Sequence, residues 1–323
     1  SPSAEEDENQ GCAQLPLLSP TASKCTRPNA LIGLGFTDID NNLLISCEEL
    51  AARAGQPHVR IVDCRFSLQD PGAGQQQYLA GHIPQAVYAD LDKDLAAAVA
   101  RGTGRHPLPA PEAFAATLER LGIGRDTQVV AYDQDSGALA ARLWWMLRWV
   151  GHTNAVLLDG GLARWNLLGL PLEDGPQSVA KTTYAPDVRP ELVLQTDEIV
   201  AALPHVNALK LVDAREAQRF DGVLEPIDPV AGHIPGAINF PWKNNITGDG
   251  LYQPKALLHD QYKKIICETP GDNIVFMCGS GVTACHSLLA LEYIGISGAR
   301  LYPGSWSEWI SSPDRPVETS PRA

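Results

Sequence analysis

One cysteine in the sequence stands where a thiol becomes chemically reactive. An apolar stretch at residues 273–277 ends at Cys278, two glycines and a serine follow, and residues 284–293 are apolar again. This order predicts a strand, a tight turn and a helix N-terminus, where backbone N–H groups and the helix dipole favour an anion. We therefore expect a largely ionised, nucleophilic thiol, around which the glycines wrap closely because they tolerate positive φ and carry no Cβ. The alternative is a buried cysteine that only ends a core strand.

The loop at residues 278–284, Cys-Gly-Ser-Gly-Val-Thr-Ala, resembles that of the mercaptopyruvate sulfurtransferases, a branch of the rhodanese family. In rhodaneses the two residues after the cysteine are usually basic, whereas here they are Gly279 and Ser280. The resemblance runs from roughly Asn42 to Pro316. It implies an α/β fold of two tandem rhodanese-like domains, each a mainly parallel sheet flanked by helices. It also implies that Cys278 takes a sulfur from a donor as a persulfide, with no metal or organic cofactor.

The resemblance further implies a hydroxyl relay that uses both halves of the chain. In the family, the loop serine works with a histidine and an aspartate of the N-terminal domain, and Ser280, His106 and Asp92 match these positions. Asp92 matches less closely, because the insertion between it and His106 is longer than in the family. Such a relay would help to protonate the enolate-like group that leaves as pyruvate. The alternatives are a turn serine that bonds its own backbone and an ordinary loop histidine.

A donor with a carboxylate also needs a cation. The family uses two arginines, of which Arg219 matches the first, whereas Ile227 stands at the second position. This departure weakens the assignment to mercaptopyruvate, because paired guanidinium groups capture a carboxylate with two parallel hydrogen bonds. Arg105 is a candidate replacement. The loop residues expected to contact the donor are Gly279, Gly281, Val282 and Thr283.

The elements that must position these residues occur twice in the chain. Landmarks of the first half recur about 150 residues later. They include a strand closed by aspartate at 59–63 and 209–213, Gly-His-Ile-Pro at 81–84 and 232–235, strands at 128–132 and 274–277, and short helices at 160–165 and 304–309. Further strands at 85–88 and 155–157 alternate with helices at 111–121 and 137–150, which predicts parallel sheets covered on both faces.

The repeat also predicts which copy is active. Asp133 occupies the position of Cys278, and the acidic segment that follows it, residues 134–137, contains one glycine. An aspartate cannot carry a sulfane sulfur and would repel an anionic donor. The first copy is therefore predicted to be inert. The resemblance to the tandem sulfurtransferases implies the same, and it places the site in the cleft between the two domains. Residues that recur in both copies or lie beside these landmarks are predicted to be scaffold: Asp63, His82, Asp213, Arg215 and His233.

Composition sets the domain boundaries that we expect. Residues 1–41, rich in Ser, Pro and acids, are expected to form a disordered or extended tail, in which Cys12 and Cys25 have no assigned role. The inert domain is placed at 42–170, a proline-rich linker at 171–190, the catalytic domain at 191–316 and a C-terminal tail at 317–323.

The net charge and the cysteines limit the classes of binding partner and the cellular compartment that we expect. The chain has 323 residues and a net charge of −13, which argues against nucleic acid and anionic membranes. No apolar run approaches the ~20 residues that cross a bilayer. Seven scattered cysteines without a Cys-x-x-Cys pair favour reduced thiols and a cytoplasmic location, and the N-terminus lacks the features of secretory and transit peptides. The expected partners are mercaptopyruvate or thiosulfate as donor and a thiol, such as thioredoxin or a small thiol, or cyanide as acceptor.

Two other functions share the strand, cysteine loop and helix. Cysteine phosphatases and arsenate reductases require an arginine six positions after the cysteine, where this chain has Ala284, so a phosphate would lack its partner. A binding module with two inert repeats is disfavoured because Cys278 is retained. Between the two sulfur donors, the loop favours mercaptopyruvate, and Ile227 keeps thiosulfate as the alternative.

Overall fold

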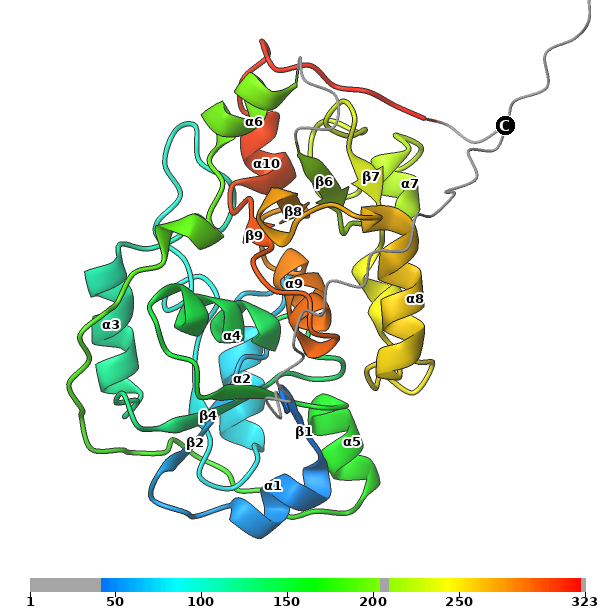
Figure 1. Ribbon diagram of the computed structural model, residues 1–323. Helices are drawn as coiled ribbons and strands as arrows, with labels where there is room; N and C mark the ends of the chain where they lie inside the picture. Colours follow the sequence, from blue (N-terminus) through cyan, green and yellow to red (C-terminus); the bar gives the residue numbers. More distant parts are fainter. Residues whose placement is uncertain (1–41, 204–208, 321–323) are drawn as a thin grey trace, which may run out of the picture. The chain divides into compact units, whose positions relative to one another are not determined.

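The strands whose pattern repeats in the sequence build two separate parallel sheets (Figure 1). The structure, a computed structural model, describes residues 42–203 and 209–320. The expected N-terminal tail at 1–41, with Cys12 and Cys25, lies outside the described residues.

The first sheet lies within residues 42–203 and has the order β1-β5-β4-β2-β3, with every pair of neighbours parallel. Its strands are β1 (Leu44–Ile45), β2 (Val59–Asp63), β3 (Val87–Tyr88), β4 (Gln128–Tyr132) and β5 (Ala155–Leu158). The helices of this half are α1 (Cys47–Arg53), α2 (Ala73–Ala80), α3 (Pro111–Arg120), α4 (Ala140–Trp149) and α5 (Gly161–Leu167).

The second sheet repeats this arrangement as β7-β6-β8-β9, again parallel throughout the described residues. A parallel bridge between Val193 and Leu301 takes the place of β1. The strands are β6 (Lys210–Asp213), β7 (Ile238–Asn239), β8 (Ile274–Met277) and β9 (Arg300–Leu301). The helices are α6 (Thr196–Ala202), α7 (Ala217–Phe220), α8 (Lys255–Ile266), α9 (Ala284–Tyr293) and α10 (Ser305–Trp309), with 3₁₀ turns at Pro190–Leu192, Trp242–Asn245 and Gly271–Asn273. The predicted fold of two α/β repeats is confirmed.

Two predicted boundaries differ from the structure for local reasons. The strand expected from residue 85 begins at Val87, because Gln85 has φ +64° and the chain turns there. The helix expected from residue 137 begins at Ala140, because backbone amides of the preceding loop bond the Asp133 side chain instead of forming helical bonds.

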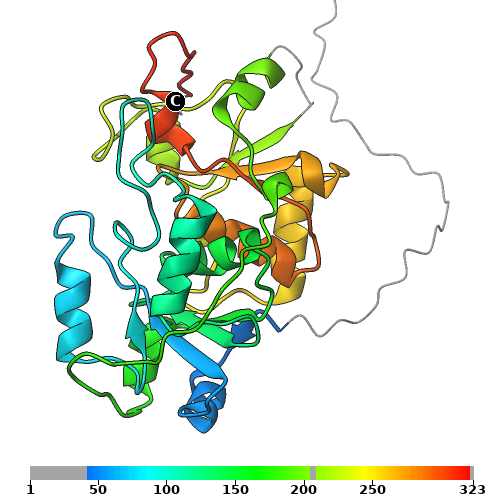
Figure 2. The ribbon, with the colours of Figure 1, turned by 90° about the vertical axis from the view of Figure 1, so that its left-hand side faces the viewer.

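Helices α4 and α9 join the two halves and lie side by side in both views (Figures 1 and 2). Every side chain from Ala140 to Leu147 and from Ala284 to Leu291 is buried, as expected for helices that are mostly apolar around their circumference. One continuous cluster of buried side chains contains Val129 of the first sheet and Phe276 of the second. The outer faces of the two sheets have separate clusters around Trp165 and Trp306. The two halves therefore share their inner core.

The recurring polar residues make the same contacts in both copies. Asp63 pairs with Arg65 and Asp213 with Arg215, each at 2.6 Å, and both pairs are buried. The rings of His82 and His233 hydrogen-bond the carbonyl oxygens of Tyr78 and Phe220 at 2.9 and 2.8 Å. This symmetry agrees with the scaffold interpretation.

The segments outside the two repeats run along them. Within 171–190, Thr182 and Tyr184 donate side-chain hydrogen bonds to the carbonyls of Ile123 and Val150 in the first half. Near the C-terminus, Glu318 exchanges two backbone hydrogen bonds with His233. The domain boundaries stay a prediction. Among the described residues, no helix is long and apolar enough to cross a membrane.

A buried histidine at the junction makes stability depend on pH. His286 of α9 is fully buried and hydrogen-bonds the carbonyl of Ser136 through Nε2 at 3.0 Å. Burial lowers the pKa of His286 to about 3. The unfolded chain, with an ordinary histidine pKa of about 6.5, thus binds one more proton than the folded chain between the two values. This contribution to stability is complete above about pH 6.5 and is lost as the pH falls towards 3.

We expect His286→Gln to flatten the dependence of the unfolding free energy on pH. Between about pH 4 and 6, its slope should be smaller than that of the wild type by about 1.4 kcal/mol per pH unit, the value for one proton. Urea unfolding at a series of pH values measures this slope. His58→Gln, at an exposed position, is the control and should keep the wild-type slope. Equal slopes for His286→Gln and the wild type would contradict the prediction.

Candidate active site

The loop that begins at Cys278 is fixed by backbone contacts. Cys278 directly follows β8 and is 2% exposed. Its N–H donates to Ser305 Oγ at 3.1 Å, and its carbonyl accepts from Trp306 N at 3.0 Å. Ser305 is fully buried and has φ +54°, a left-handed conformation that costs free energy for a residue other than glycine. The start of α10 therefore holds the cysteine in place.

The two glycines of the loop serve different purposes. Gly281 has φ +73°, and a Cβ on it would lie 2.5 Å from the carbonyl oxygen of Pro303. Gly279 has no positive φ, but a Cβ on it would lie 2.8 Å from Nη2 of Arg105 and 3.4 Å from Nη2 of Arg219. The first glycine makes the turn possible, and the second leaves room for two guanidinium groups beside Cys278.

The structure brings the three predicted relay residues together. Ser280 Oγ lies 2.8 Å from Nδ1 of His106, and Nε2 of His106 lies 3.3 Å from Oδ1 of Asp92. The Phe66 ring packs edge-on against the imidazole, with 6.3 Å between the ring centroids. Ser280 belongs to the second domain and the other two to the first, so this group spans both domains.

His106 is held in its neutral form. Burial, followed by the charges of Arg142 and Arg105, lowers the pKa of His106 to about 3. The nearby carboxylate of Asp92 can only accept and so favours the tautomer of His106 with its proton on Nε2. Nδ1 then accepts from the hydroxyl of Ser280. The serine is in this way oriented by a neutral base.

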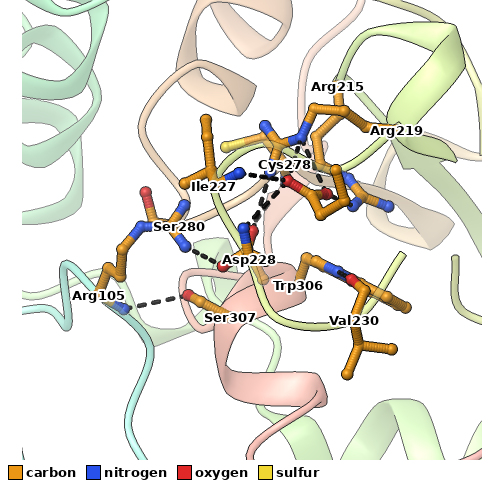
Figure 3. Close-up of polar contacts among 12 residues, drawn as sticks. Arg105, Arg215, Arg219, Ile227, Asp228, Val230, Cys278, Ser280, Trp306 and Ser307 are labelled. Atoms are coloured by element: carbon orange, nitrogen blue, oxygen red, sulfur yellow. Dashed lines mark hydrogen bonds and ion pairs between the residues drawn. The ribbon is translucent and has the colours of Figure 1, made fainter. Parts of the chain in front are cut away.

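Two arginines from different domains converge beside the nucleophile (Figure 3). Arg219 of α7 donates from Nη2 to Asp228 at 2.8 Å and from Nε to Glu225 at 2.9 Å. Arg105 of the first domain forms an ion pair with the same Asp228. Burial raises the pKa of Asp228, and the charge of Arg105 opposes this rise. Ile227 is 45% exposed and lines the same cleft.

The loop that carries Arg105 and His106 is docked on the second domain through its backbone. Arg105 N donates to Ser307 Oγ at 3.0 Å (Figure 3). A Cβ on Gly104 would lie 2.6 Å from the carbonyl oxygen of Gly304. The backbones of the two domains are therefore in direct contact at this point.

These residues surround a cleft of about 500 Å³. Eight of the ten predicted site residues line it: Arg105, His106, Arg219, Cys278, Gly279, Ser280, Val282 and Thr283. The other two lie behind this lining. Asp92 contacts the far side of the His106 ring, and the carbonyl of Gly281 is bound from the first domain.

That contact comes from Arg142, a residue that the sequence analysis missed. Its side chain is fully buried and donates to the carbonyls of Gly281 at 2.9 Å, His106 at 3.1 Å and Leu95 at 3.3 Å. Burial lowers the pKa of Arg142. One guanidinium thus connects the cysteine loop with the relay histidine. A lone arginine within the apolar segment 140–147 is the signal that could have revealed it.

In the first domain, the loop equivalent to that of Cys278 binds a carboxylate of the protein itself. The carboxylate of Asp133 accepts four backbone N–H groups, from Asp135, Gly137, Leu139 and Ala140, at 2.7 to 3.1 Å. Burial raises the pKa of Asp133, and these amides oppose the rise. The loop of this fold therefore forms an anion cradle, which Asp133 fills permanently.

Removing that internal anion should destabilise the protein. We expect Asp133→Ala to lower the free energy of unfolding by about 3 to 5 kcal/mol, because four buried amides lose their acceptor. Asp135→Ala removes an exposed carboxylate of the same loop and should change stability by less than about 0.5 kcal/mol. Chemical denaturation of both variants measures the difference. Similar effects of the two substitutions would count against the cradle.

Replacing Arg142 should reduce catalysis more than it reduces folding. In Arg142→Met the carbonyls of Gly281 and His106 lose their shared donor, and kcat/KM should fall roughly tenfold to a hundredfold. Arg142→Lys, which keeps a buried cation, should recover part of the loss. Arg148→Met on the same helix is the control, and circular dichroism checks that each variant is folded. An Arg142→Met protein with the activity of the Arg148→Met control would rule out the positioning role.

Comparisons with known proteins identify the family. The model of the rhodanese-like domain matches residues 46–168 and 196–312. A probable 3-mercaptopyruvate sulfurtransferase of Pseudomonas aeruginosa is 46% identical over 278 residues, which are 85% of this chain and 98% of the relative. The putative thiosulfate sulfurtransferase SseB of Mycobacterium tuberculosis is 40% identical over 280 residues, 85% of this chain and 96% of the relative. The crystal structure of SseA from Escherichia coli, a 3-mercaptopyruvate sulfurtransferase, superposes with a TM-score of 0.72 at 32% identity and covers 82% of this chain and 99% of that chain. The chain belongs to the rhodanese family, as a member with two tandem rhodanese-like domains.

Proposed function

We propose that this protein is a sulfurtransferase that takes a sulfur atom from 3-mercaptopyruvate. Cys278 holds the sulfur as a persulfide, pyruvate is released, and a thiol or cyanide accepts the sulfur. The observation that carries this proposal is that Ser280 and His106, joined by a hydrogen bond, line the same cleft as Cys278, with Asp92 3.3 Å from the far side of the imidazole. The 46% identical relative from Pseudomonas aeruginosa bears the same activity in its name.

The first half-reaction needs a proton at the carbon that leaves. The Cys278 thiolate attacks the donor sulfur, a sulfur–sulfur bond forms, and the sulfur–carbon bond breaks. Its electron pair passes to the carbon and gives the enolate of pyruvate. The proton of the donor thiol ends on that carbon, so the products are the persulfide anion and pyruvate, and charge is conserved.

Ser280 is placed to move this proton. Its hydroxyl donates to the neutral His106, which leaves the oxygen free to accept the donor's S–H proton while its own proton shifts to Nδ1. The reverse shift delivers a proton to the enolate carbon. Asp92 stabilises the imidazolium that forms briefly. The persulfide anion is stabilised by the N–H groups and the helix dipole at the start of α9.

Thiosulfate is the second candidate donor. Its support is the name of the 40% identical relative and the isoleucine at position 227. Attack of the thiolate on the outer sulfur breaks the sulfur–sulfur bond of thiosulfate and releases sulfite with the electron pair. Sulfite leaves without a proton at carbon, so this reaction has no need of the relay.

In the second half-reaction, the acceptor attacks the outer sulfur of the persulfide and Cys278 leaves as a thiolate. A thiol such as thioredoxin or a small thiol becomes a persulfide, and cyanide becomes thiocyanate. These acceptors, like the cytoplasmic location, remain predictions.

A single substitution can distinguish the reaction with mercaptopyruvate from the reaction with thiosulfate. Ser280→Ala should lower kcat/KM for mercaptopyruvate by about a hundredfold or more, the usual effect of losing a proton-transfer group, and should affect thiosulfate much less. Steady-state release of pyruvate and of sulfite measures the two activities. Equal losses with both donors would argue against the relay.

Mass spectrometry tests whether Cys278 is the nucleophile. Incubation with mercaptopyruvate should add one sulfur atom to the wild type at Cys278 and none to Cys278→Ser. Cys267→Ser, at an exposed cysteine, is the control and should still gain the sulfur. A sulfur found on Cys285 or Cys267 instead would refute the assignment.

A further inference from the structure

Asp228 is the common partner of the two arginines that approach Cys278. Its side chain is 3% exposed, although the residue next to it, Ile227, is 45% exposed and lines the cleft. One of its carboxylate oxygens pairs with Arg105 of the first domain and the other with Arg219 of the second (Figure 3). Asp228 therefore binds the arginine pair in the manner in which a donor carboxylate would bind it.

The guanidinium groups nevertheless lie beside the nucleophile. Arg105 binds Asp228 through Nη1, and its Nη2 lies against Gly279, next to Cys278. Arg219 binds Asp228 through Nη2, and both its Nη1 and its Nη2 lie near Gly279, at 3.6 and 3.4 Å from the position of a Cβ on that residue. Among the side chains that the structure describes, Nε of Arg105 is buried without a hydrogen-bond partner. The pair thus keeps N–H groups for a further anion.

The charges around this pair balance. An alternating chain of ion pairs leads from the scaffold of the second domain to the first domain. Its members are Asp213, Arg215, Glu225, Arg219, Asp228 and Arg105. Three carboxylates thus face three guanidinium groups, and the network has no net charge when the donor is absent. Each negative charge that a donor brings is added to a neutral network in a largely buried position, where charge interactions are strong.

We propose that Asp228 determines donor specificity by limiting the negative charge that the arginine pair accepts, so that a donor with one carboxylate is favoured over a dianion such as thiosulfate. This inference rests on the proposed function. In it, Arg105 replaces the second arginine that is absent at position 227, and Asp228 restrains both cations. Asp228 itself contacts the arginines and takes no part in bond breaking.

The test is the ratio of kcat/KM for thiosulfate to that for mercaptopyruvate in Asp228→Asn. The amide keeps the shape of the side chain and removes one negative charge, so the dianion should gain more than the monoanion. We expect the ratio to rise about tenfold at low salt and the rise to shrink as salt screens the charges. If Asp228 only held the arginines in place, both donors would lose together and the ratio would not change, which would overturn the proposal.

Arg105→Gln provides a second, opposite test if Asp228→Asn folds poorly. This variant removes one positive charge and should lower the ratio, because the dianion loses more than the monoanion. An unchanged ratio in Arg105→Gln would also overturn the proposal. The matched control is Glu292→Gln, which removes the carboxylate of another ion pair between the domains, with Arg148 at 2.6 Å. It should leave the ratio as in the wild type.

Mass spectrometry separates failure of this inference from failure of the proposed function. If the wild type gains no sulfur on Cys278 from either donor, the sulfurtransferase proposal itself fails. If the wild type gains the sulfur and the ratio is the same in all variants, the proposed function stands and the role of Asp228 is rejected.

Discussion

The geometry of the site depends on one buried guanidinium group. Arg142 is the third residue of the largely apolar helix α4, and its described hydrogen-bond partners are the carbonyls of Leu95, His106 and Gly281. A charge removed from water is costly unless every donor finds an acceptor, so the partners cannot shift independently. Two of these carbonyls belong to the relay histidine and to the cysteine loop. The first domain thus fixes the geometry of the Cys278 loop of the second domain through a residue that does not line the cleft.

The two copies of the fold show the same loop in two chemical states. In the second domain the loop surrounds a thiol, and in the first it surrounds the carboxylate of Asp133, bonded by four amides. At equivalent positions the fold thus holds a carboxylate in one domain and a thiol in the other. In the first domain, four backbone amides bind that carboxylate.

Most elements of the fold and the position of the Cys278 loop could be predicted from the sequence, because the residue patterns that indicate them are local. The strand that ends at Cys278, the glycine turn and the repeat of Gly-His-Ile-Pro each lie within a few residues, and the predicted elements follow from them. His106 and Asp92 were found only through the family resemblance, since nothing local to them indicates a contact with Ser280.

Residues whose importance comes from tertiary packing could not be found in this way. Arg142 matters because α4 packs against α9, and Asp228 matters because a loop of the other domain brings Arg105 to it. The replacement of an expected arginine by Ile227 is visible in the sequence, but the compensating charge lies more than a hundred residues away. The missed residues are therefore those whose partners belong to the other domain.

The burial of Cys278 has a consequence for the size of the acceptor. Cys278 lines a cleft of about 500 Å³, which has room for a small thiol or cyanide. A folded protein meets a steric filter, since Cys278 is 2% exposed. Any protein acceptor must carry its cysteine on a narrow, protruding loop or chain end rather than on a flat face.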